Sequence, residues 1–333
     1  MKRPVILLSG LALLLLTSCA TTATPPLVAP STSQERSRPE GPLRFDDTIA
    51  YVSDELGNYE IFVLMAGELA VRLTETEEDE SLPTWSPDGG QIAFGRREAD
   101  NTMDVWVMNA DGSGQRKIYD SGSVYLEGIS WHANGGRVYF GRGYFDGPGN
   151  MGQKIVAVSV DDPETQQALS VGRLWDRHFT YTYPDVTRDG ARIAFAHYEG
   201  YAMPFRHEIY VGHLSADGMS ASNIVQLTGE QAGDSSPAWS RDGTAIAWVH
   251  ETDIDSGNYD IWVMNADGSG MRQVTSEPGE EIDPVWSADG QGIIYASNEG
   301  GTFQLYMVYA WGDEQVLQLI DNDANNIHPD LRP

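Results

Sequence analysis

The same nine residues, WVMNADGSG, occur twice in this chain, at Trp106–Gly114 and at Trp262–Gly270. A second stretch, P-x-W-S-x-D-G followed by I-A-F or a close variant, occurs in three copies, and two more divergent copies accompany them. In each copy a Trp or Val lies seven residues before a β-branched residue. The repeat constrains the fold strongly, because such a unit buries its apolar face only against another copy of itself. The copies are Ser81–Arg96, Gly128–Arg142, Thr182–His197, Ser235–His250 and Ile282–Ser297.

Each unit predicts short strands joined by tight turns. Asp-Gly pairs, such as Asp88-Gly89 and Asp111-Gly112, tolerate positive φ and are typical of hairpins. The β-branched and aromatic runs between them have no helical period. A sixth unit opens at Ile49, without a Trp before it. With four strands in each of six units, the sequence predicts an all-β fold, a six-bladed β-propeller of four-stranded blades.

The two ends of the chain are predicted to meet in blade 1. That blade lacks its first strand on the N-terminal side, whereas Pro329–Pro333 matches Pro83–Pro87 in form. We therefore expect the C-terminal strand to complete blade 1 and to close the ring. An unclosed ring would expose two sheet edges, which promote aggregation.

The combined pattern, P-x-W-S-x-D-G, then I-A-F/W/Y, then D-I-W-V-M-N-A-D-G-S-G and L-T, resembles the repeats of the TolB-type propeller. The resemblance covers Phe45–Pro333 and implies the propeller fold and a binding function in the cell envelope. TolB itself is a periplasmic component of an envelope-spanning complex, with a small α/β domain before its propeller and no lipid anchor. We expect no such domain here, so the resemblance implies no individual site residue.

The N-terminus has the pattern of an export signal. Lys2 and Arg3 precede an apolar run of signal-peptide length. Residues 16–19, Leu-Thr-Ser-Cys, resemble the bacterial lipobox, and Cys19 is the only cysteine; an ordinary secretory signal is the alternative. We predict a lipoprotein signal peptide over 1–18, a lipidated Cys19 with a Thr/Ser/Pro-rich tether over 19–42, and the propeller over 43–333.

Such a protein would be exported and lipid-anchored, either on the periplasmic side of an outer membrane or on the extracellular face of a cytoplasmic membrane. Its formal net charge of −28 excludes nucleic acid as a partner, because phosphate binding needs a basic face. The acidity is consistent with cation binding or with solubility in a saline habitat. We expect a monomeric propeller with envelope proteins or glycans as partners.

Four cationic residues are predicted to gather on the face that carries the loops from strand two to strand three. Arg96, Arg142, His197 and His250 end the second strand of blades 2 to 5, and serines occupy this position in blades 1 and 6. A ring of these side chains at the channel mouth would suit a carboxylate, phosphate or uronate. The alternative is that each cation pairs with a local acid and stiffens its blade. The acids considered are Glu98, Glu199 and Glu251.

The same face of blades 3 and 4 carries the longest insertions, which are rich in aromatic residues. Exposed aromatic rings would suit a protein interface or a sugar platform. Packing of the rings on one another, as a lid, is the alternative. The candidates are Tyr144, Trp175, Tyr198, Tyr201 and Phe205.

Catalytic and metal motifs are weak. The chain has no G-x-S-x-G, no H-E-x-x-H and no cysteine besides Cys19. Asp321, Asp323 and Asn325 have the spacing that begins a calcium loop but lack the residues that complete it, so a solvated acidic rim is favoured over a site for Ca²⁺ or another divalent cation.

We therefore predict a lipid-anchored propeller that binds protein partners in the envelope, rather than an enzyme. The alternative is a carbohydrate-binding protein or a lyase-type enzyme. Its site would be formed by the His and Arg residues at the channel mouth.

Overall fold

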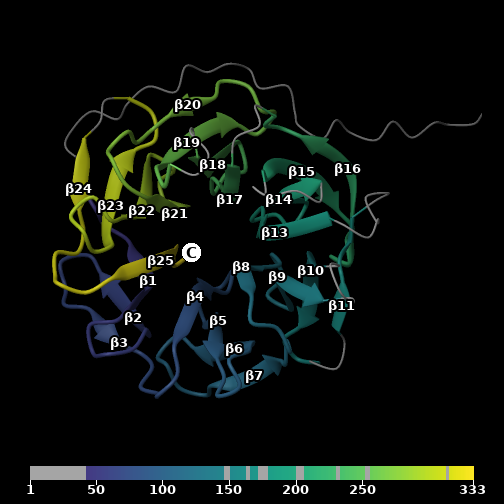
Figure 1. Ribbon diagram of the computed structural model, residues 1–333, viewed down its shortest axis with the longest axis horizontal. Coiled ribbons are helices and arrows are strands. Elements are labelled where there is room, and N and C mark those ends of the chain that lie inside the picture. Colours follow the sequence, from purple (N-terminus) through teal and green to yellow (C-terminus); the bar gives the residue numbers. More distant parts are fainter. Residues whose placement is uncertain are drawn as a thin grey trace, which may run out of the picture.

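The structure, a computed structural model, describes residues 43–145, 151–162, 166–171, 179–199, 206–229, 233–251, 256–312 and 315–333. These ranges contain strands and turns, and none of their segments is a helix that could cross a membrane. The sheets lie in a ring around a centre at which the chain ends (Figure 1). The predicted all-β propeller class is confirmed.

Four repeats form separate four-stranded antiparallel sheets. Repeat 1 contains β25 (Asn326–Leu331), β1 (Thr48–Ser53), β2 (Glu60–Met65) and β3 (Val71–Arg72); repeat 2 contains β4 (Glu80–Trp85), β5 (Gln91–Arg97), β6 (Met103–Asn109) and β7 (Arg116–Tyr119). Repeat 5 contains β17 (Gly233–Trp239), β18 (Ala245–Glu251), β19 (Tyr259–Asn265) and β20 (Arg272–Gln273); repeat 6 contains β21 (Glu281–Trp286), β22 (Gly292–Ser297), β23 (Gln304–Tyr309) and β24 (Val316–Gln318).

Repeats 3 and 4 share one nine-stranded sheet, so the prediction of six separate four-stranded blades is wrong. The connection is a parallel pair between β10 and β13, at Gln153 and Thr180. β9 and β10 have nine residues each and β13 has eight, which exceeds the six or seven of the innermost strands β4, β8 and β17. The longer strands β10 and β13 meet at this parallel pair.

The shared sheet has the order β12-β16-β15-β14-β13-β10-β9-β8, with β11 beside β10. Residues 166–171 contribute β11 to the edge of repeat 3 and β12 to the edge of repeat 4. The strands are β8 (Leu126–Trp131), β9 (Arg137–Phe145), β10 (Met151–Ser159), β11 (Gln166–Ala168), β12 (Ser170–Val171), β13 (Phe179–Val186), β14 (Arg192–Glu199), β15 (Glu208–Leu214) and β16 (Ser220–Gln226).

The first sheet combines strands from both ends of the described chain. β25 pairs antiparallel with β1, with Ile49 opposite Leu331 and Ser53 opposite Asn326. β25 thus occupies the innermost position that β4 occupies in repeat 2. The innermost strands β25, β4, β8, β13, β17 and β21 surround the centre of the ring (Figure 1).

Every innermost strand carries the same irregularity. Its pairing with the second strand shifts register at one point, as between Ser81 and Thr84 in β4, and the shift coincides with a residue of positive φ. Five of the six residues are not glycine, and such a conformation costs a non-glycine residue about 1–3 kcal/mol. We call these residues the bulge ring: Leu82, Gly128, Tyr183, Ser236, Asp283 and His328, with φ between 49° and 61°.

The core lies between neighbouring sheets, where the second strands contribute their largest side chains. Phe94, Phe140, Phe195 and Trp248 are at most 1% exposed. Each belongs to a repeated I-A-F-type run, which explains why those positions retain large apolar residues. Burying one such side chain contributes roughly 1.5–3 kcal/mol relative to leaving it exposed.

Hydrogen bonds from tryptophans join neighbouring innermost strands. The backbone N–H of Trp239 donates to Asp185 Oδ2 over 2.6 Å, and that of Trp85 donates to Asp330 Oδ2 over 2.7 Å. Trp131 Nε1 donates to the carbonyl of Thr84 over 3.0 Å. Burial raises the pKa of Asp185 to about 6 and that of Asp330 to about 7.

The raised pKa of Asp330 predicts a pH-dependent stability. An unfolded chain releases this proton near pH 3.8, whereas the folded chain holds it to about pH 7. The contribution of this carboxyl to the free energy of unfolding is therefore fully present below pH 3.8 and is lost as the pH rises to about 7. Between about pH 5 and about pH 8, we expect the free energy of unfolding of Asp330→Asn to fall by about 2–3 kcal/mol less than that of the wild type.

Urea unfolding at both pH values, followed by Trp fluorescence, measures the difference. Asp323→Asn removes an exposed carboxyl and serves as the control, with wild-type pH dependence. Equal falls in the wild type and in Asp330→Asn would contradict a raised pKa at this residue.

Candidate functional site

Two cavities lie along the centre of the ring; all six bulge-ring residues line one of them, and all except Gly128 line the other. We call the face with the Asp-Gly turns the turn face, and the opposite face, with the loops from strand two to strand three, the loop face. The cavity on the turn face has a volume of about 300 Å³ and is lined by Asp185, Asp330 and the repeated tryptophans of the innermost strands. The cavity on the loop face is larger, about 600 Å³, and extends outwards to Arg97, Tyr125 and Glu251. A cavity of this size and shape is the usual place for a ligand or a partner segment.

The loop-face cavity is predominantly acidic. Its basic residues are Arg97 and two histidines. His328 lies 3.8 Å from an oxygen of Asp283, and His207 lies 3.1 Å from Thr180 Oγ1. Burial lowers the pKa of His207 to about 4, so its ring is neutral at pH 7. The carboxyls that line the cavity are Glu127, Asp234, Glu251, Glu280 and Asp283.

Exposed apolar residues border this cavity where repeat 2 joins repeat 3. Val124 is 38% exposed and Tyr125 is 53% exposed, and both contribute to the cavity wall. Neither residue could be identified from the repeat pattern, because the segment that joins β7 to β8 lies between the repeated motifs. The bulge ring was not predicted either, although most of its members precede the proline of the repeated P-x-W motif.

The four predicted cations occupy equivalent positions in the strands. Each lies between one residue of the innermost strand and one residue of the third strand. Arg96 lies between Glu80 and Asp104, and His250 lies between Asp234 and Asp260. Two of the four cations are therefore flanked by carboxylates on both sides.

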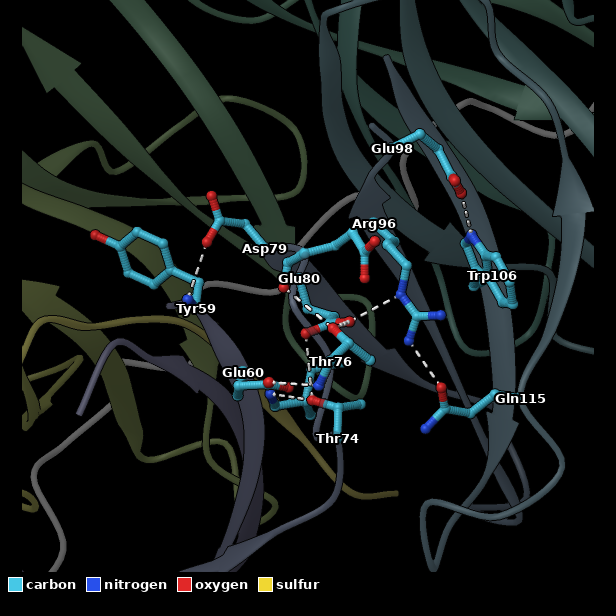
Figure 2. Close-up of polar contacts among 12 residues, drawn as sticks. Tyr59, Glu60, Thr74, Thr76, Asp79, Glu80, Arg96, Glu98, Trp106 and Gln115 are labelled. Atoms are coloured by element: carbon cyan, nitrogen blue, oxygen red, sulfur yellow. Dashed lines mark hydrogen bonds and ion pairs between the residues drawn. The ribbon is translucent and has the colours of Figure 1, made fainter. Parts of the chain in front are cut away.

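Arg96 is almost fully buried in a polar network. Its Nε donates to Glu80 Oε1 over 2.8 Å and its Nη2 to Gln115 Oε1 over 2.7 Å, while the guanidinium carbon lies 4.4 Å from the ring centre of Trp106 (Figure 2). Burial, together with the neighbouring Glu60, raises the pKa of Glu80 to about 7. Arg96 therefore follows the alternative prediction, in which each cation pairs with an acid of its own blade, and the acid is Glu80. Glu98 instead accepts from Trp106 and pairs with Lys117.

The two histidines are also held within their sheets. His197 is 2% exposed, stacks on Tyr181 at 4.5 Å between ring centres, and has its Nδ1 2.9 Å from the carbonyl of Thr180. His250 has its Nδ1 2.7 Å from Asp234 Oδ1. The acidic partner of His250 is Asp234, on the innermost strand, rather than Glu251.

Arg142 differs from the other three. Its guanidinium carbon lies 6.0 Å from the ring centre of Tyr119, and its buried Nε has no hydrogen-bond partner. The four residues therefore do not form a ring of equivalent cations at the channel mouth. Anion binding by them stays a prediction, and Arg142 is the member that the contacts leave best suited to it.

The remaining predicted site residues are only partly described. Tyr198 is half-buried in β14, with its ring 6.1 Å from that of His207. Tyr144 lies in β9, opposite Gly152. The remaining candidates, Trp175, Tyr201, Phe205 and Cys19, lie outside the described residues.

The proposed calcium-loop residues lie between β24 and β25. Asn325 holds this loop against repeat 1, because its Nδ2 donates to Asp54 Oδ2 over 2.8 Å and its backbone N–H to Asp54 Oδ1 over 2.8 Å. Asp321 and Asp323 are exposed. In the part of the chain that the structure describes, no three His, Cys, Asp or Glu side chains are grouped closely enough to hold a metal ion.

The network of Arg96 predicts a structural role that substitution can test. Arg96→Ala would remove two charged hydrogen bonds and leave Glu80, whose pKa is already about 7, to take up a proton, so we expect the free energy of unfolding at pH 7 to fall by about 2–3 kcal/mol. Arg97→Ala is the matched control, because its partly exposed side chain lies 3.9 Å from Asp79 and contributes at most about 1 kcal/mol. Urea unfolding measures both variants, and similar losses in the two would contradict the assigned role.

Comparison with known proteins identifies the repeat family. A family model described as the TolB beta propeller domain matches residues 154–333, more than half of the chain. An uncharacterized protein of Agrobacterium fabrum (strain C58 / ATCC 33970) is 27% identical over 209 residues, which cover 61% of this chain and 67% of that protein.

Two solved structures show how widely the fold is shared. TolB from Acinetobacter baumannii has a TM-score of 0.67 at 19% identity, covering 88% of this chain and 68% of its own. An oligogalacturonate lyase from Vibrio parahaemolyticus has a TM-score of 0.54 at 13% identity, covering 87% and 79%. At these identities the likeness shows the fold alone. The family match decides the assignment: this chain belongs to the TolB β-propeller domain family.

Proposed function

We propose that this protein is a lipid-anchored, exported β-propeller that binds protein partners of the cell envelope with its loop face. The loop-face cavity of about 600 Å³ carries the proposal, because it opens beside the exposed Val124 and Tyr125. A protein partner needs both an apolar contact area and a polar surround, and this face offers the two together. The propeller supplies a rigid frame for these contacts. We count its four four-stranded sheets as one blade each and the shared sheet of repeats 3 and 4 as two blades.

The charge of the cavity indicates what such a partner would present. Five carboxyls line the cavity, against one arginine, one neutral histidine and His328, which lies beside Asp283. Complementary charge speeds association and selects among partners. A partner segment with a basic side chain next to an apolar one therefore fits this face best.

The proposal of a lipid anchor is based on the N-terminal sequence. We propose that Cys19 is lipidated and that residues 19–42 hold the propeller at a distance from the membrane. Cell fractionation compares the wild type with Cys19→Ser: we expect the wild type in the membrane pellet and the variant in the supernatant. Equal distribution of the two would contradict lipidation at Cys19.

The binding proposal is tested by capture of envelope proteins on the purified full chain. We expect a Val124→Ser/Tyr125→Ala variant to lose at least about nine tenths of the captured partner, because exposed aromatic and aliphatic residues are typical binding hot spots. Quantitative mass spectrometry measures the loss. The control is Val316→Ser, which removes an apolar residue that is 52% exposed, close to the 53% of Tyr125, from the outer strand β24.

Retention of the partner by the loop-face variant, or its loss from Val316→Ser alone, would place the binding surface elsewhere. A wild-type protein that captures nothing specific would count against a protein-binding function. Near-ultraviolet circular dichroism of each variant shows whether its fold is retained.

A further inference from the structure

Two carboxyl side chains are buried close together where repeat 5 meets repeat 6. Asp260, in β19, is 2% exposed, and Glu281, in β21, is 1% exposed. The residues before them, Tyr259 and Glu280, form a parallel β-bridge, and the backbone N–H of Tyr259 donates to the carbonyl of Gly279 over 3.0 Å. This bridge brings the two acidic positions next to each other. Neither acid lines either of the two central cavities.

The junction of repeats 1 and 2 contains the equivalent pair of acids, Glu60 and Glu80, and each of them has its own cation. Arg72 Nη2 lies 2.8 Å from Glu60 Oε1. Arg96 Nε lies 2.8 Å from Glu80 Oε1 (Figure 2). Two buried carboxyls therefore face two guanidinium groups at that junction.

Both cations are replaced by neutral residues at the junction of repeats 5 and 6. Gln273 occupies the position of Arg72 on the outer strand, and Ser297 occupies that of Arg96 on the second strand. The hydroxyl of Ser297 donates to Glu281 Oε1 over 2.9 Å, which satisfies one oxygen but supplies no charge. This junction thus has the two acids of repeats 1 and 2 without the two guanidinium groups.

One imidazole lies beside the acidic pair. Burial raises the pKa of Asp260, and the hydrogen bond with Gln273 and the charge of His250 oppose the rise. However, His250 Nδ1 also lies 2.7 Å from Asp234 Oδ1, so a protonated His250 would face three carboxyls. Burial, followed by the negative charges of nearby carboxyls that include Asp260, raises the pKa of Glu281 to about 7. Negative charge at this junction therefore exceeds positive charge when Glu281 is ionised.

One oxygen of each carboxyl has no partner among the described residues. Asp260 Oδ1 and Glu281 Oε2 are buried and accept no hydrogen bond there. At the junction of repeats 1 and 2, only Glu60 Oε2 is in the same state. A buried polar atom without a partner is costly, and each such atom in a native structure requires an explanation. A cation between the two carboxyls would satisfy both oxygens and supply the missing charge.

We propose that Asp260 and Glu281 bind a Ca²⁺ ion inside the junction of repeats 5 and 6. Ca²⁺ takes oxygen ligands in flexible geometry, from carboxylates, neutral groups and water. Two carboxylates match its charge, and the hydroxyl oxygen of Ser297 and water molecules would complete the set of ligands. The ion would stabilise this junction as Arg72 and Arg96 stabilise that of repeats 1 and 2. The site is separate from the surface proposed for protein partners.

Calorimetric titration with CaCl₂ tests the proposal. The full chain is purified in a nonionic detergent, freed of metal with EDTA, dialysed and titrated at about pH 8, where Glu281 is ionised. We expect one saturable site with a Kd on the order of 0.1–1 mM, the range of extracellular calcium modules. Asp260→Asn/Glu281→Gln keeps the shape of both side chains and should lose this binding. The matched control, Asp321→Asn/Asp323→Asn, removes two exposed carboxyls and should keep the wild-type affinity.

Thermal melting separates a metal ion from a proton as the compensating charge. At about pH 8 we expect 5 mM CaCl₂ to raise the melting temperature of the wild type by about 2–4 °C relative to EDTA, and that of Asp260→Asn/Glu281→Gln by less than about 1 °C. Absence of saturable binding to the wild type, or equal affinity in the double variant, would overturn the proposal. If the double variant fails to fold, Glu281→Gln alone serves, and its affinity should be at least about tenfold weaker.

Discussion

The bulge ring is the constraint on which the centre of this molecule depends. One residue in each innermost strand adopts a left-handed conformation, and the pairing with the second strand shifts at the same point. The shift lets the inner strand turn its preceding residues towards one cavity and its following residues towards the other. Gly128 shows how close the inner strands then come, because a Cβ atom there would lie 2.7 Å from the Cα of Tyr183. Only a well-packed surrounding structure retains such a conformation in non-glycine residues.

This strongly acidic chain places several of its basic side chains against buried carboxylates. Arg96 and His250 lie inside their sheets against carboxylates, and Lys117 bridges Glu98 and Asp104. The positive charges of Arg96 and Lys117 offset buried negative charge, which is expensive to leave unpaired. The loop-face cavity keeps an excess of acids. Arg142 differs from Arg96 and His250, because its strand neighbours are Leu126 and Lys154 rather than carboxylates.

Much of the fold could be predicted from the sequence, because turn chemistry and strand patterning recur in every copy. Short stretches of sequence are enough to recognise the Asp-Gly turns, the apolar second strands and the likeness of Pro329–Pro333 to Pro83–Pro87. The shared sheet of repeats 3 and 4 could not be predicted, since it follows from strand lengths and one parallel pair at Gln153 and Thr180.

The candidate site was less predictable, for a related reason. The equivalence of the four cations could be read from the repeat, but their partners could not. Glu80 lies sixteen residues before Arg96 and meets it only across the antiparallel strands. The acids close in sequence, Glu98 and Glu251, were therefore the wrong partners. Burial of His197 under Tyr181 also depends on which face of the sheet is covered.

The pairing of β25 with β1 affects how the chain folds during synthesis and how it resists a pulling force. Among the described strands, β1 is the first to leave the ribosome and its inner neighbour β25 is the last. One edge of the first sheet therefore stays open until β25 has been synthesised. Once β25 is in place, β1 is held along both edges, by β2 and β25. A pull transmitted through the N-terminal segment would then act on a strand clamped on both sides and would have to shear two ladders at once.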